Sequence, residues 1–144
     1  MKINTILIIL LCFSIVCYAG CQSSATPDNN EKNNNILTIT GDGVLSVEEC
    51  ETKALGDTVM MLESKYCGHC KATLPDFEEA CEEKGVKPVI LDISEESDKA
   101  VMESHNVEIM YTPTFIIGCK YYIGAKQKEE YLQLLEDFLR GEIQ

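Results

Sequence analysis

The chain has 144 residues, of which 45% are hydrophobic, and a formal net charge of −12. Allowing for an N-terminal segment, this length accommodates one domain of roughly 100 residues with its own core. The 12 basic residues form no stripe and are outnumbered by 24 acidic ones, which excludes a nucleic-acid partner. The acidic residues alternate with apolar positions, a pattern that indicates solvated helix faces.

The N-terminus has the form of a targeting segment. Lys2 precedes an apolar run over residues 6–17, which is too short for a membrane-spanning helix and is typical of a signal peptide over residues 1–20. The Ala-Gly-Cys sequence that ends at Cys21 resembles the lipobox of prokaryotic lipoproteins, with Tyr18 in place of the usual aliphatic residue. We expect lipidation at Cys21. The alternatives are ordinary signal cleavage and an uncleaved anchor.

A polar tether follows this segment. Residues 21–35 contain almost no apolar side chains and cannot contribute to a core. We therefore expect three parts: a signal peptide at 1–20, a tether at 21–35 and one domain at 36–144. This organisation predicts an extracytoplasmic protein that is anchored to a membrane as a lipoprotein.

The first elements of the domain lead toward a pair of cysteines. An alternating pattern predicts a short strand over residues 36–40, and the glycines at 41–43 indicate a turn. Ser46 is suited to cap a helix that ends near residue 55. A compact apolar run at 58–62 fits a buried central strand, which delivers the chain to Cys67.

The later elements are predicted in the same way. The helix that begins at Cys67 carries apolar side chains at spacings of three and four and ends near Gly85. Ser94 is suited to cap the next helix. The other predicted elements are a strand at 88–93, a helix at 95–105, strands at 114–117 and 121–123, and a helix at 127–139. The predicted order is β-α-β-α-β-α-β-β-α.

The sequence Cys67-Gly68-His69-Cys70 indicates redox chemistry. A cysteine at a helix start faces unpaired backbone N–H groups and the positive end of the helix dipole, which stabilise its thiolate. We therefore predict that Cys67 is the nucleophile. Cys70 lies one turn later and deeper, so it can attack a mixed disulfide on Cys67 and release the substrate. His69 supplies a second donor and, when protonated, a nearby positive charge.

Two other interpretations of the pair are disfavoured. A Cys-x-x-Cys pair can be half of a zinc site, but Cys81, His105 and Cys119 do not form the second close pair that such a site needs. A purely structural disulfide would close so short a loop that it would remove little entropy from the unfolded chain. We therefore predict a redox-active disulfide and no metal site.

Several motifs beyond the cysteine pair match one known family. Residues 66–71, Tyr-Cys-Gly-His-Cys-Lys, are similar to the aromatic-Cys-x-x-Cys-Lys core of thioredoxins, with the Gly-His dipeptide of protein disulfide isomerases. Pro75 lies where thioredoxins kink the active-site helix. The Thr-Pro-Thr sequence at 112–114 is similar to the cis-proline segment, and Gly-Ala at 124–125 also matches. In this order, the motifs resemble the thioredoxin superfamily over residues 36–140.

The resemblance implies an α/β, thioredoxin-like fold with a central mixed sheet flanked by helices. It also implies that Pro113 is cis and lies beside the thiols. Tyr66, Thr112 and Pro113 would then shape the substrate-binding surface. Protein thiols and disulfides are the implied substrates, and no cofactor is implied beyond the dithiol.

The sequence departs from the family at two places. Many relatives carry a buried Asp or Glu six residues before the first active-site cysteine, where this chain has Met61. Water, Glu63 or another group would then accept the proton of the resolving thiol. About two extra residues also precede Pro113, around positions 109–111, and would reshape the substrate surface.

The remaining cysteines leave the disulfide pairing open. Cys12 and Cys17 fall within the predicted signal peptide. Cys81 lies on the apolar face of its helix and is interpreted as a small buried hydrophobe. A bridge from Cys50 to Cys81, or one that involves Cys119, is compatible with the sequence.

Together these features predict an exported thiol-disulfide oxidoreductase that exchanges disulfides with protein substrates. The Gly-His dipeptide favours an oxidase or isomerase. One alternative is an extracytoplasmic reductase supplied by a membrane electron-transfer partner. Another is a non-catalytic thioredoxin-like binding module whose cysteines are idle.

Overall fold

The computed structural model describes residues 36–141. The predicted signal peptide, the tether and the lipidation at Cys21 lie outside these residues, as do Cys12 and Cys17. Within the described range, none of the helices combines the length and the apolar character that a membrane crossing requires.

A five-stranded mixed sheet forms the centre of the domain. Its strands, in spatial order, are β2 (Gly43–Val44), β7 (Lys120–Ile123), β6 (Thr114–Ile117), β3 (Val59–Glu63) and β4 (Val89–Asp92). The β3–β4 pair is parallel, and the other three pairs are antiparallel. The predicted central mixed sheet is therefore confirmed, and β3 lies between two neighbours, as its apolar run indicated.

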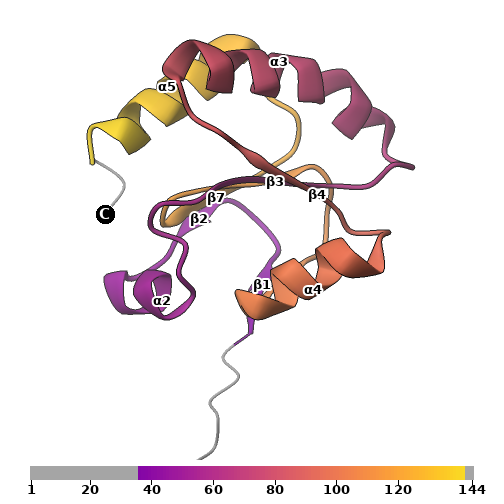
Figure 1. The fold of residues 1–144 in the computed structure, drawn as a ribbon, viewed down its shortest axis with the longest axis vertical. Helices are drawn as coiled ribbons and strands as arrows, with labels where there is room; N and C mark the ends of the chain where they lie inside the picture. The colour runs from indigo at the N-terminus through magenta and orange to yellow at the C-terminus, as the bar shows by residue number, and fades with distance from the viewer. Residues whose placement is uncertain (1–35, 142–144) are drawn as a thin grey trace, which may run out of the picture. The chain divides into compact units, whose positions relative to one another are not determined.

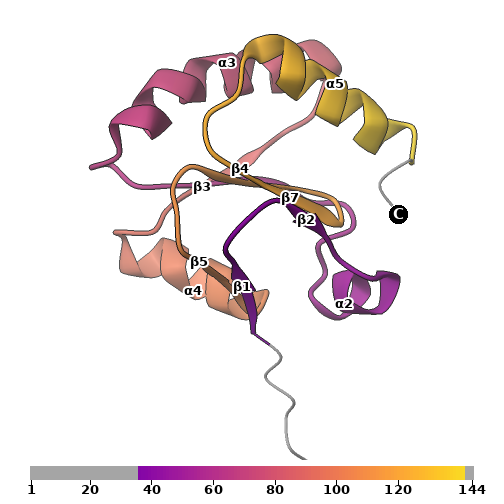
Figure 2. The same cartoon turned by 180° about the vertical axis from the view of Figure 1, so that it is seen from behind.

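Helices cover both faces of this sheet, as Figures 1 and 2 show. On one face lie α3 (Gly68–Lys84) and α5 (Lys128–Leu139), and on the other lie α2 (Val47–Thr52) and α4 (Glu96–Ser104). The second face also carries a small parallel sheet of β1 (Leu37–Ile39) and β5 (Val107–Ile109). This is the helix-flanked α/β architecture that the sequence predicted.

The alternation of side chains in β3 divides the core into two clusters. Val59 and Met61 pack on the face covered by α3 and α5, together with Cys70 and the aromatic rings of that cluster. Met60 and Leu62 point to the opposite face and pack with residues of α2 and α4. Because successive strand residues point to opposite faces, β3 contributes to both clusters.

Local signals at the helix ends position the elements as expected at two sites. Ser46 caps α2 through a capping box with Glu49, in which the Ser46 side chain accepts from the Glu49 backbone N–H. Cys67 is the N-cap of α3, and Gly85 ends that helix at φ +67°, where a residue without Cβ is favoured. The cysteine pair therefore lies at the N-terminus of α3, with Cys67 as the capping residue.

Other predictions about individual elements are wrong. Ser94 does not cap α4, because its hydroxyl donates to Asp92 Oδ1 and Glu95 is the N-cap. The predicted turn at 41–43 ends inside β2, and β5 was not predicted. No local pattern marks β2 or β5, because pairing with β7 and β1 specifies these two short strands.

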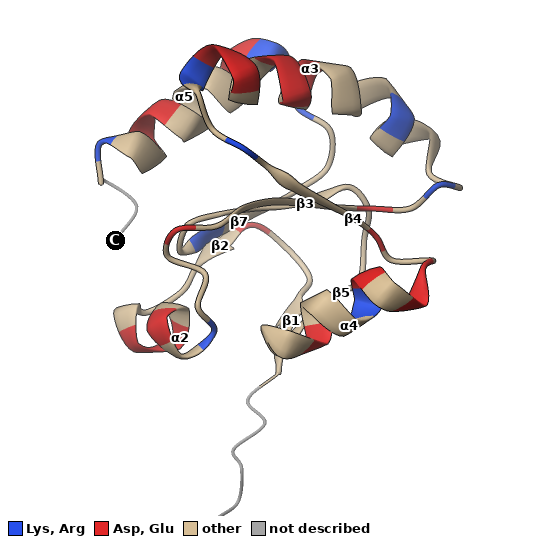
Figure 3. Cartoon of the chain, in the orientation of Figure 1, with Lys and Arg blue, Asp and Glu red and all other residues tan. Residues whose placement is uncertain are grey.

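Acidic residues occur in each of the described helices α2, α3, α4 and α5, as the red segments of Figure 3 show. On α3, Glu78, Glu79, Glu82 and Glu83 are all exposed. The acidity therefore marks solvated helix faces, as the alternation with apolar positions predicted.

Candidate active site

The cysteine pair lies at the junction between the end of β3 and the start of α3. A short turn follows β3, in which the Cys67 backbone N–H donates to the Ser64 carbonyl at 2.8 Å. Cys67 then takes the N-cap position of α3, and its Sγ accepts from the Cys70 backbone N–H at 3.1 Å. The sulfur therefore occupies the place of a helix-capping acceptor, where the dipole favours negative charge.

The two cysteines form a disulfide but differ in burial. Their Cα atoms are 5.3 Å apart. Cys67 is partly exposed, whereas Cys70 is fully buried in the cluster beneath α3. Since thiol-disulfide exchange requires access to the attacked sulfur, only Cys67 is open to an external thiol. The predicted placement of Cys70 as the deeper thiol is confirmed.

The electrostatic surroundings favour a thiolate at Cys67. The first turn of α3 contains no acidic residue. His69 and Lys71 are both exposed in this turn. The helix terminus and the Cys70 N–H supply the stabilisation that an anionic sulfur needs.

The predicted proline segment lies beside Cys67. The Thr112–Pro113 peptide bond is cis, as expected, and Pro113 is buried. The Thr112 carbonyl oxygen lies 3.5 Å from Cys67 Sγ. The Gly124 N–H donates to the Pro113 carbonyl at 2.8 Å and so holds the segment in place. The structure thus brings Cys67, Cys70, Thr112 and Pro113 together.

Exposed apolar side chains are close in sequence to the two residues of this contact. Tyr66, immediately before Cys67, is 80% exposed. Met110 and Tyr111, which precede Thr112, are 63% and 57% exposed. The sequence indicated extra residues around positions 109–111, but it did not identify Met110 and Tyr111 as exposed, because exposure is set by the fold and not by the local sequence.

The last residue of β3, Glu63, carries a carboxyl group and precedes Cys67 by four residues in the sequence. Glu63 is partly buried, and desolvation together with the charge of Asp92 raises its pKa, while Lys71 opposes the shift. Met61, at the position that is acidic in many relatives, is fully buried in the cluster that contains Cys70.

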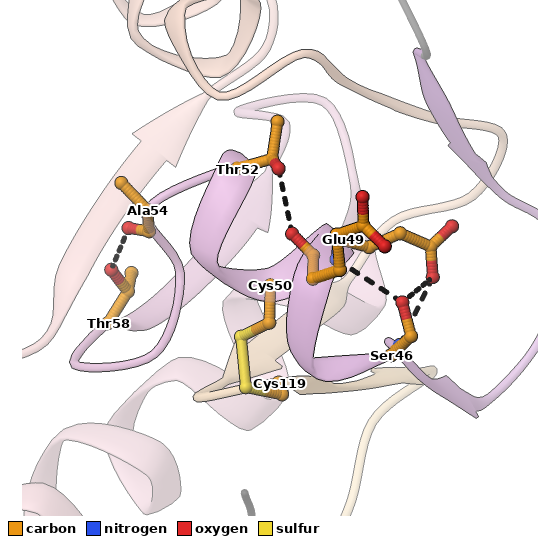
Figure 4. The surroundings of a disulfide bond; sticks show 8 residues. Ser46, Glu49, Cys50, Thr52, Ala54, Thr58 and Cys119 are labelled. Carbon is orange, nitrogen blue, oxygen red and sulfur yellow. Dashed lines mark hydrogen bonds between the residues drawn. A yellow bond between two sulfur atoms is a disulfide. The ribbon is translucent and has the colours of Figure 1, made fainter.

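A second disulfide lies away from these residues. Cys50 of α2 is joined to Cys119, which follows β6, with a Cα–Cα distance of 5.4 Å (Figure 4). Both sulfur-bearing residues are buried. The alternative bridge from Cys50 to Cys81 is therefore wrong, since Cys81 has no disulfide partner among residues 36–141.

Cys81 is a buried core residue, as its position on the apolar helix face predicted. It is inaccessible to solvent, and burial raises the pKa of its thiol to about 12. His105, to which the sequence assigned no chemical role, makes a 2.7 Å hydrogen bond through Nδ1 with the Lys53 carbonyl. In the described part of the chain, no group of three His, Cys, Asp or Glu side chains is arranged to hold a metal ion.

Known proteins that are similar to this chain include thioredoxins and a protein named as a protein disulfide-isomerase. The thioredoxin family model matches residues 48–137. A Schizosaccharomyces pombe protein whose name assigns it as a protein disulfide-isomerase is 35% identical over 101 residues, which are 68% of this chain. The matched part is only 17% of that protein's length.

Two solved structures of thioredoxins also match the chain. A chloroplastic thioredoxin z is 23% identical, with 74% of this chain and 96% of the other covered and a TM-score of 0.47. A thioredoxin of Malassezia sympodialis is also 23% identical, with 72% and 90% covered and a TM-score of 0.44. The family model includes both cysteines of the pair and Pro113 and spans more than half of the chain, which therefore belongs to the thioredoxin family of thiol-disulfide oxidoreductases.

Proposed function

We propose that this protein is an exported, membrane-tethered oxidoreductase that exchanges disulfides with protein substrates through Cys67 and Cys70, as an oxidase or isomerase. The observation that carries the proposal is the asymmetry of the pair. Cys67 is partly exposed at the N-terminus of a 17-residue helix, and Cys70 is fully buried. This arrangement suits a cycle with one attacking and one resolving thiol.

In the oxidising direction, a substrate thiolate attacks Cys67 Sγ and the Cys67–Cys70 bond breaks, so that Cys70 leaves as a thiolate. A second substrate thiolate then attacks the substrate sulfur of the mixed disulfide. The substrate disulfide forms, and Cys67 leaves as a thiolate. Two electrons pass from the substrate dithiol to the protein, and the two cysteine thiolates take up the two protons that the substrate thiols released, which gives the dithiol.

The helix terminus favours this direction. The Cys70 N–H and the α3 dipole stabilise Cys67 as a leaving thiolate. When protonated, His69 adds a positive charge to the same turn. A better-stabilised thiolate makes the corresponding disulfide more oxidising. This argument supports an oxidase or isomerase over a reductase supplied by a membrane electron donor.

The substrate surface in this proposal consists of Tyr66, Thr112 and Pro113. Tyr66 offers an exposed ring next to Cys67, and the Thr112 carbonyl lies at the sulfur. Pro113 has no backbone N–H to donate. An extended substrate can therefore form hydrogen bonds with the neighbouring backbone groups in place of Pro113.

Substitution of each cysteine tests the catalytic proposal. Cys67→Ser should abolish turnover in a disulfide-exchange assay, whereas Cys70→Ser should accumulate mixed disulfides that mass spectrometry detects. Cys81→Ala is the matched control, because it removes a buried cysteine outside the pair, and it should retain activity. Full activity in both pair variants would contradict the proposal and support a binding module with idle cysteines.

The location has a separate test. Lipidation at Cys21, after removal of residues 1–20, would tether the domain through the polar segment 21–35. The wild-type chain should then fractionate with membranes of the producing cells, and Cys21→Ala should be released into the soluble fraction. Equal fractionation of the two chains would exclude a lipid anchor at Cys21.

A further inference from the structure

Glu63 is a carboxylate at the active-site end of the central strand. It is the last residue of β3, and its carbonyl accepts from the Ile93 N–H at 2.9 Å, which fixes its backbone against β4. Since side chains alternate along a strand, Glu63 shares the face of Val59 and Met61. That face packs beneath α3 in the cluster that contains Cys70.

The groups around Glu63 come from three elements. Asp92 is paired with Glu63 in the register of β3 and β4. Lys71 of α3, the residue after Cys70, attracts the Glu63 carboxylate electrostatically. On the other side, the start of β6 brings Thr114 opposite Leu62 and places the uncharged Pro113 just before it. Glu63 is therefore a partly buried carboxylate with one anionic and one cationic neighbour.

These surroundings make Glu63 a stronger base than a solvated carboxylate. Desolvation is the larger cause of its raised pKa, and the charge of Asp92 is the next. Asp92 itself accepts from the backbone N–H and the hydroxyl of Ser94, which lower its own pKa and keep it charged. The Asp92 charge is thus available to hold a proton on Glu63.

In the isomerase direction of the proposed function, the reduced pair attacks a substrate disulfide through Cys67, and release of the substrate by Cys70 requires such a base. Cys70 must lose a proton before it can attack, but it is inaccessible to solvent and packs with apolar side chains such as Met61 and Phe77. Met61 offers no acceptor. Glu63 is the carboxylate that β3 presents on the same face, two residues beyond Met61.

We propose that Glu63 accepts the proton of Cys70 during resolution of the mixed disulfide. This inference rests on the proposed function. The Cys70 thiol gives its proton to the Glu63 carboxylate, directly or through one water, and becomes a thiolate. The thiolate attacks Cys67 Sγ, the Cys67–Cys70 bond forms, and the bond to the substrate sulfur breaks. The substrate leaves as a thiolate, and Glu63 returns its proton to that thiolate or to solvent.

The two steps can be timed separately with dithiobis(nitrobenzoate), an aromatic disulfide that releases one coloured thiolate per attack. In the reduced full-length chain, the first release reports attack by Cys67 and the second reports resolution by Cys70. The double variant Cys67→Ser/Cys70→Ser, which retains the other thiols of the chain, provides the background. Cys70→Ser should show only the first release.

Glu63→Gln should leave the first release unchanged and slow the second by about 100-fold, the lower end of the contribution of a positioned base. In the wild type, the second rate should fall as the pH decreases through the pKa of Glu63, and this inflection should be missing in Glu63→Gln. A second rate within about threefold of wild type, with the same pH profile, would overturn the inference.

Asp92→Asn is the matched control on the neighbouring strand, because asparagine retains an oxygen that can accept from Ser94. It should preserve the second rate at neutral pH and move the inflection to lower pH, since it removes the like charge beside Glu63. An unchanged inflection would contradict the assignment of that inflection to Glu63. If the wild type itself showed no second release, the proposed function would fail rather than the role of Glu63.

Discussion

Replacing Cys50 and Cys119 together by alanine removes the covalent link between α2 and the end of β6. The two residues are 69 positions apart in the chain, so their bond closes a long loop in the unfolded state. The loop-entropy relation gives a loss of about 4 kcal/mol for a loop of this length. Both side chains are buried, so the bond should also persist when the accessible pair is reduced.

Urea denaturation of the oxidised chain measures this loss as a change in the free energy of unfolding. Cys67→Ser/Cys70→Ser is the matched control. Its bond spans a separation of only 3, for which the same relation gives about 2 kcal/mol. A loss below about 1 kcal/mol for Cys50→Ala/Cys119→Ala, or a loss smaller than that of the control, would refute the reasoning.

Three further predictions concern the core and the sheet edge. Tyr131→Phe removes the hydroxyl that bonds Thr73 at 2.7 Å and should cost about 1–2 kcal/mol in thermal denaturation; an unchanged midpoint would contradict this. Cys81 should resist alkylation in the native chain and react after unfolding, as mass spectrometry can show, and rapid native modification would contradict its burial. Gly43→Ala should lower the midpoint by overpacking, because a Cβ there meets the Tyr121 ring; an equal or higher midpoint would show that the ring moves freely.

The elements and residues of the candidate site that carry strong local signals could be predicted from sequence. A buried strand, a capping cysteine and a Pro-containing segment each have a pattern of several residues, and the structure brings Cys67, Cys70 and Pro113 together as expected. The cis bond at Pro113 was implied only by the family resemblance, because a sequence does not determine the isomer.

Features that depend on distant segments could not be predicted. The partner of Cys50 is set by how α2 packs against the end of β6, which no local pattern describes. The short strands β2 and β5 exist because β7 and β1 pair with them. Ser94 has the correct residue type for a helix cap, but the nearby Asp92 carboxylate competes for its hydroxyl.

The reduction potential of the Cys67/Cys70 pair tests the central claim most directly. The fully oxidised chain would be equilibrated in glutathione or dithiothreitol buffers, and the free thiols of the pair counted after alkylation. An oxidase or isomerase predicts a value of about −120 to −180 mV, whereas a value near about −270 mV would contradict that direction and indicate a reductase. A pair that never closes reversibly would contradict the enzymatic account as a whole.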